Sequence, residues 1–121
     1  MMDAQKKVVF LIEDDESVVR SLKRNLEDRG YEVIAALTQL VAIDWFAVHR
    51  DRLDIILLDA CVPGNRINTI PLLKHFRTSG YDGRVIAVSN DHDFNVALLQ
   101  AGATGWCYKN EILKRWDSFW G

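Results

Sequence analysis

The sequence has few cysteines, few prolines and no long apolar run. Its two cysteines, Cys61 and Cys107, are too few for a disulfide framework, and their spacing matches no zinc motif. We expect both to be buried thiols in a reducing, cytoplasmic setting. No apolar run approaches the roughly 20 residues that span a bilayer, and the N-terminal MMDAQKK has no secretory core. These absences argue against a membrane partner and against secretion.

The sequence also has no large excess of charge of either sign. Its formal net charge is −2 at pH 7 and it contains no basic stripe, so we expect no direct binding of nucleic acid. Apolar residues make up 49% and charged residues 26%, which is ordinary for a globular protein. A length of 121 residues fits one domain. We therefore expect residues 1–121 to form a single domain.

Five short apolar runs recur along the chain. They are VVFLI (8–12), YEVIAA (31–36), LDIILLD (53–59), RVIAVS (84–89) and GWCYK (105–109). The first, third and fourth runs are almost entirely apolar, which indicates strands covered on both faces. Such strands are typical of a parallel sheet, because half-exposed antiparallel strands alternate polar and apolar residues.

Helical patterns lie between and after these runs. The five predicted helices begin near Val18, Thr38, Pro71, Phe94 and Asn110. Gly30 is a typical C′ residue for the first helix, and Ile112, Leu113 and Trp116 share one face of the fifth. Alternating strands and helices predict a doubly wound (βα)5 α/β domain with a five-stranded parallel sheet.

Polar residues follow the apolar runs directly. Glu13 and Asp14 follow the first, Asp59 ends the third, Ser89 ends the fourth and Lys109 ends the fifth. In open parallel sheets, binding sites form beyond the carboxyl ends of the strands. We therefore expect three carboxylates, a hydroxyl and an ammonium group to meet in one pocket.

These residue types suggest phosphoryl chemistry. Carboxylate oxygens without His or Cys favour a hard cation, Mg²⁺ or Mn²⁺, over zinc. Because three acids would repel a phosphate, a divalent ion is needed to reverse the sign of the pocket. Asp59 then suits a nucleophile that forms an aspartyl phosphate. Lys109 and Ser89 would hydrogen-bond the transferred oxygens.

Four stretches resemble the receiver domains of two-component response regulators. They are IEDDESVVRSL (12–22), IILLDACVPG (55–64), VIAVSN (85–90) and QAGATGWCYK (100–109). They occur in the family's order and near its spacing, and the resemblance covers essentially the whole chain. It implies a CheY-like, flavodoxin-like fold and a Mg²⁺-dependent phosphoprotein.

The resemblance also implies a role for each matching residue. Asp59 resembles the phosphoacceptor, and Asp14 the direct metal ligand with Glu13 beside it. The backbone carbonyl of Cys61 would be a further metal ligand. Lys109 matches the family's lysine, and the remaining two matches are the switch residues Ser89 and Trp106. Asp15 and Glu16 are instead interpreted as acids at a helix N-terminus.

The implied function is to accept a phosphoryl group from a histidine kinase or phosphotransfer protein. Such a domain catalyses its own phosphorylation and dephosphorylation and has no external substrate to turn over. The signal would leave through the predicted fourth helix, fifth strand and fifth helix, and homodimerisation through that face is possible. Trp116, Phe119 and Trp120 crowd it, either as a functional surface or as packing against the sheet.

The chain departs from the family pattern at several positions. Arg66-Ile67 replaces Asp-Gly, so the loop after Asp59 is expected to differ in shape. Asn90 follows the switch hydroxyl, where a small residue is usual. Asn110 replaces proline after Lys109, so we expect a trans bond there.

Three other functions are alternatives to this interpretation. A haloacid-dehalogenase-like phosphatase needs D-x-D, but Ala60 and Cys61 follow Asp59. A flavodoxin-like cofactor binder needs a phosphate loop where this chain has four acids. The remaining alternative is a pseudo-receiver, an interaction module that works without phosphorylation.

Overall fold

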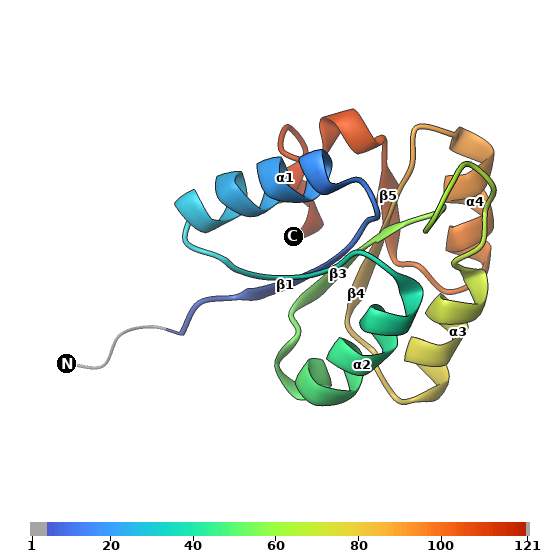
Figure 1. The fold of residues 1–121 in the computed structure, drawn as a ribbon, viewed down its shortest axis with the longest axis horizontal. Helices are drawn as coiled ribbons and strands as arrows, with labels where there is room; N and C mark the ends of the chain where they lie inside the picture. Colours follow the sequence, from blue (N-terminus) through green and yellow to red (C-terminus); the bar gives the residue numbers. More distant parts are fainter. Residues whose placement is uncertain (1–4, 121) are drawn as a thin grey trace.

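The computed structural model describes residues 5–120. It contains a five-stranded sheet with helices packed around it (Figure 1). The strands are β1 (Val8–Ile12), β2 (Glu32–Ala36), β3 (Ile55–Asp59), β4 (Arg84–Val88) and β5 (Gly105–Cys107). The α-helices are α1 (Glu16–Asp28), α2 (Gln39–His49), α3 (Ile70–Thr78) and α4 (His92–Gln100). The predicted strands are therefore present, although β5 ends two residues before Lys109.

All pairs of neighbouring strands are parallel, in the order β2-β1-β3-β4-β5. Because β1 and β3 are neighbours, residues at their carboxyl ends lie side by side, with Ile12 paired to Leu58. Every residue of β1 and β3 is buried, as the continuous apolar runs predicted. The doubly wound parallel fold is confirmed.

Helices cover both faces of the sheet (Figure 1). One apolar core joins the sheet to α2, α3 and α4, and a second joins its other face to α1 and the C-terminal segment. None of the helices in residues 5–120 is long and apolar enough to cross a membrane.

The starts of two helices agree with the sequence predictions. The Asp15 carboxylate accepts from the backbone N–H groups of Ser17 and Val18 and caps α1, so its role at a helix N-terminus is confirmed. Thr38 caps α2 by accepting from the Val41 N–H at 3.1 Å. After α1, Gly30 adopts a φ of +96°, the left-handed conformation that glycine tolerates best.

The prediction of a fifth α-helix is wrong. The segment after β5 forms two short 3₁₀ helices, η2 (Lys109–Glu111) and η3 (Trp116–Phe119), neither with a side-chain cap. The predicted inward face is correct, since Ile112 and Trp116 are buried. Because neither segment has a side-chain cap, tertiary packing decides the local geometry.

The C-terminal aromatic residues surround Tyr31, at the start of β2. The Tyr31 ring makes an edge contact with Trp116 and stacks on Trp120 at a centroid distance of 5.7 Å. Trp116 also contacts Phe119. These contacts support the packing interpretation of the aromatic cluster over an exposed functional surface. The face expected to transmit the signal therefore consists of α4, β5 and the segment with the two 3₁₀ helices η2 and η3.

Candidate functional site

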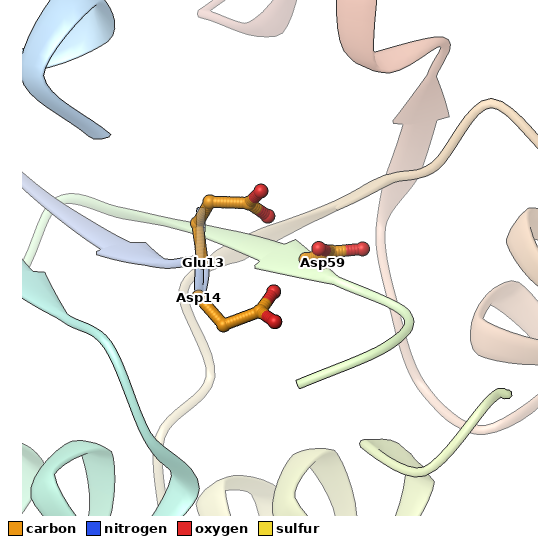
Figure 2. Close-up of side chains that lie close together, drawn as sticks. All are labelled: Glu13, Asp14 and Asp59. Carbon is orange, nitrogen blue, oxygen red and sulfur yellow. The ribbon is translucent and has the colours of Figure 1, made fainter. Parts of the chain in front are cut away.

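The three predicted carboxylates lie together at the carboxyl ends of β1 and β3 (Figure 2). Glu13 and Asp14 follow β1, and Asp59 is the last residue of β3. Carboxylate oxygens from all three lie within 4.8 Å of one another. Glu13 is 1% exposed and Asp59 3% exposed, so two acids are buried at one point of the structure. That arrangement is costly unless positive charge is present.

Lys109 supplies one positive charge to this cluster. Its Nζ donates to Asp59 Oδ2 at 2.9 Å and to Glu13 Oε1 at 3.1 Å. The lysine thereby joins the end of β5 to the ends of β1 and β3, as its place after the fifth apolar run predicted. One ammonium group faces three carboxylates, so the cluster retains an excess of negative charge.

The electrostatics of the site reflect this imbalance. The pKa of Glu13 is raised to about 8, because burial and the neighbouring Asp59 carboxylate raise it more than Lys109 lowers it. Burial opposes the positive charge of Lys109, but the bonds and charges of Asp59 and Glu13 still raise its pKa above the ordinary value. The acids therefore hold the lysine firmly in its charged form.

The residues present fit a divalent cation. Glu13 Oε2 is buried and has no hydrogen-bond partner among the described residues, although a buried carboxylate oxygen normally has one. The available metal ligands are oxygen atoms of three carboxylates, the type of ligand that Mg²⁺ and Mn²⁺ prefer. A cation beside them would satisfy the unpaired oxygen and balance the remaining charge.

The loop after Asp59 is fixed to the acidic cluster by backbone groups. The Cys61 N–H donates to Asp59 Oδ1 at 3.2 Å, and the Gly64 N–H donates to Asp14 Oδ2 at 3.4 Å. The loop contains a cis bond between Val62 and Pro63, the only cis bond within residues 5–120. The Lys109–Asn110 bond is therefore trans, as predicted.

Three polar side chains that the sequence did not single out hold this loop in place. Thr69 Oγ1 donates to the Asp59 carbonyl oxygen at 2.8 Å. The Asn68 side chain accepts from the Val62 N–H at 2.8 Å. Gln39, the first residue of α2, donates to the Val62 carbonyl oxygen at 2.7 Å. No spacing rule marks these residues, because each is a single polar side chain that bonds a backbone group at no fixed sequence separation.

Ser89 lies directly after β4 and is buried. Its Oγ accepts from the Asp91 N–H at 3.1 Å, and Asp91 caps α4. Within residues 5–120, no hydrogen bond joins Ser89 to Asp59, so the structure does not bring the hydroxyl onto the carboxylates. Trp106, on β5, is half-buried and its ring contacts His92 and Tyr108.

Asn95 is a further buried polar residue that sequence reasoning missed. It lies on α4 and is fully buried. Its Nδ2 donates to the carbonyl oxygens of Ser89 at 2.9 Å and Cys107 at 3.4 Å. One side-chain amide on α4 therefore bonds the backbone directly after β4 and the backbone at the end of β5.

The sequence of the chain matches the family model of the response regulator receiver domain over residues 9–115. The chain belongs to this family. The response regulator MprA of Mycobacterium avium is 30% identical over 113 residues, which cover 88% of this chain and 48% of MprA. The DNA-binding transcriptional activator EvgA of Escherichia coli is 31% identical over 107 residues, 84% of this chain and 50% of EvgA. The receiver domain thus spans about half the length of both relatives.

Solved structures support the same fold. The chemotaxis protein CheY4 of Vibrio cholerae superposes with a TM-score of 0.80 at 20% identity and covers 95% of this chain and 99% of its own. CheY of Borrelia burgdorferi, in a complex described as CheX-CheY-BeF3-Mg, gives a TM-score of 0.79 at 20% identity over 95% of this chain and 90% of its own. The receiver domain of this chain is therefore CheY-like in architecture.

Proposed function

We propose that residues 1–121 form one receiver domain that accepts a phosphoryl group on Asp59 from a histidine kinase or phosphotransfer protein. The observation that carries this proposal is the position of the Asp59 carboxylate. It lies within 4.8 Å of the Glu13 and Asp14 carboxylates and accepts a hydrogen bond from Lys109 at 2.9 Å. The free thiols Cys61 and Cys107 suit a cytoplasmic location, where disulfides are rare.

In the proposed reaction, an Asp59 carboxylate oxygen attacks the phosphorus atom of a phosphohistidine. A new O–P bond forms and the N–P bond breaks, so that the imidazole leaves with the electron pair. Glu13, Asp14, Asp59 and the Cys61 carbonyl would hold the divalent cation. When bound, Mg²⁺ or Mn²⁺ supplies the positive charge that lets phosphoryl oxygens approach these acids.

Lys109 and Ser89 have separate tasks in this reaction. Lys109 already donates to Asp59, and its ammonium group would donate to a phosphoryl oxygen. Ser89 accepts from the Asp91 N–H, and its hydroxyl donates to no group within residues 5–120. We propose that this hydroxyl turns toward the phosphoryl group.

The signal would then leave through α4 and β5. Movement of Ser89 would weaken its bond to the Asp91 N–H at the start of α4, and Trp106 on β5 would turn into the vacated space. Phosphorylation would bias this two-state element by adding contacts in one state only. The changed face would bind a partner or a second copy of the domain. The pseudo-receiver alternative is not favoured, because it assigns no role to the clustered carboxylates and Lys109.

Intact-protein mass spectrometry tests the proposal. With Mg²⁺ and phosphoramidate, the wild-type protein should gain one phosphoryl group, while Asp59→Asn should gain none. Asp82→Asn, which changes an exposed aspartate away from the cluster, is the matched control and should react as wild type does. Equal phosphorylation of Asp59→Asn would show that another residue is the acceptor.

A further inference from the structure

Large apolar side chains are exposed on only one segment of residues 5–120, which consists of α2 and the turn before it. The six are Leu37, Leu40, Val41, Ile43, Trp45 and Val48. Leu40 and Val48 are 71% and 72% exposed. Residues four apart are neighbours on a helix surface, so most of these side chains form one continuous patch. We call the exposed side of α2 formed by residues 40, 41, 44, 47 and 48 the outer face.

This exposure is not explained by the packing of the fold. Ala42 and Phe46 are the buried residues of α2, and they are enough to seat the helix on β2 and α3, beside which it lies (Figure 1). An amphipathic helix would carry polar residues on its opposite side. A helix that is apolar all round is normally covered on all sides, and a grouped apolar patch marks an interaction surface.

One charged residue lies at the centre of the outer face. Asp44 is exposed, and the residues three and four positions away from it are Leu40, Val41, Ala47 and Val48. Asp44 forms no ion pair within the part of the chain that the structure describes. A partner that covers the apolar neighbours must also desolvate this carboxylate, which is costly unless the partner provides a cation or a strong donor.

The position of Asp44 selects among possible partners. A symmetric contact between two copies, centred on the outer face, places the two Asp44 carboxylates against each other, and like charges at an interface are strongly unfavourable. An anionic lipid surface is disfavoured for the same reason. A helix with an apolar stripe and one basic residue can cover the apolar patch and pair its basic side chain with the Asp44 carboxylate.

We propose that the outer face of α2 is a docking site for an amphipathic helix of a partner protein that carries an arginine or lysine within its apolar stripe. The basic side chain pairs with Asp44, and the stripe covers Leu40 and Val48. This interaction goes beyond the phosphoryl-transfer function.

Two dye-labelled synthetic helical peptides test the proposal by fluorescence anisotropy. They share a leucine stripe and differ at one stripe position, which is arginine in one and glutamate in the other. Wild-type protein should bind the arginine peptide about five- to tenfold more tightly, as a charge pair in a covered site implies. Asp44→Lys should reverse this preference. Glu27→Lys, which makes the same charge change at an exposed position on α1, should not.

Two further measurements complete the test. Leu40→Ser combined with Val48→Ser should reduce binding of the arginine peptide at least about tenfold while the circular dichroism spectrum stays unchanged, since both side chains are exposed. Equal affinity for the two peptides, or no reversal in Asp44→Lys, would overturn the proposal. The proposal would also be overturned if wild type forms a dimer in sedimentation and the double serine variant does not. Binding of wild type, but not of the variant, to phosphatidylglycerol vesicles would overturn it as well.

Discussion

The side-chain amide of Asn95 donates to the carbonyl oxygen of Ser89 at 2.9 Å and so joins the middle of α4 to the residue directly after β4. The same amide also donates to the Cys107 carbonyl at 3.4 Å. A second bond, from the Asp91 N–H to Ser89 Oγ at 3.1 Å, joins the start of α4 to the same residue. The position of α4 is thus fixed by both the backbone and the hydroxyl of Ser89.

Asn95→Ala should destabilise the domain, because the buried carbonyl groups of Ser89 and Cys107 lose their side-chain donor. We expect the free energy of unfolding to fall by about 1–3 kcal/mol. Urea denaturation followed by circular dichroism measures this change. Asn90→Ala, at an exposed position next to Ser89, should stay within about 0.5 kcal/mol of wild type. Equal stabilities of the two variants would mean that the Asn95 bonds contribute nothing.

Ser89→Ala separates phosphorylation from signal transmission. The variant should still gain a phosphoryl group on Asp59, because Ser89 is not bonded to that carboxylate in residues 5–120. It should lose the accompanying change at Trp106, since no hydroxyl remains to turn toward the phosphoryl group. Tryptophan fluorescence of wild type and variant with beryllofluoride and Mg²⁺ measures this difference, with Trp106→Phe identifying the contribution of Trp106. A wild-type response in Ser89→Ala would contradict the proposed switch.

Asp14→Ala should abolish the binding of Mg²⁺. In the wild type we expect the ion at about 2.0–2.1 Å from carboxylate oxygens, with waters completing an octahedron. Because a ligand that binds only the folded state stabilises it, Mg²⁺ should raise the melting temperature of the wild type. Asp14→Ala should show no such rise, whereas Glu16→Gln, an exposed acid on α1, should behave as wild type. An unchanged Mg²⁺ affinity in Asp14→Ala would refute the site.

Lys109→Ala should leave Mg²⁺ binding intact but impair phosphorylation. The variant removes the donor to Asp59 and Glu13, so without Mg²⁺ two buried carboxylates face each other and the domain loses stability. Added Mg²⁺ should therefore raise the melting temperature of Lys109→Ala more than that of wild type. Lys114→Ala, an exposed lysine in the same segment, is the control. Rapid phosphorylation of Lys109→Ala would show that the ammonium group is dispensable.

The sequence predicted those elements that follow from a repeated residue pattern. The continuous apolar runs predicted the buried strands, and the carboxyl ends of parallel strands then brought Glu13, Asp14 and Asp59 together. The C-terminal segment was mispredicted because its residues have helical spacing, whereas contacts with Tyr31 decide its geometry. Asn95 was missed because a lone polar residue on a helix gives no sign that its amide bonds a distant strand.

Cys107 gives a prediction about pH. The thiol is fully buried, and burial raises its pKa from 9.0 to about 11. The folded state therefore keeps the proton more strongly than the unfolded state does. This contribution to stability is complete below pH 9 and is lost as the pH rises toward about 11, since the unfolded chain ionises first.

Comparison with Cys107→Ala isolates this effect from the titration of other groups. Between pH 8 and pH 11, roughly the range that spans both thiol pKa values, wild type should lose more unfolding free energy than the variant does. Urea denaturation at several pH values measures the difference. Burial also raises the pKa of the Cys61 thiol, so Cys61→Ala should likewise lose less unfolding free energy than wild type over this range. Parallel pH profiles for wild type and Cys107→Ala would show that the Cys107 thiol ionises equally well in the folded and unfolded states.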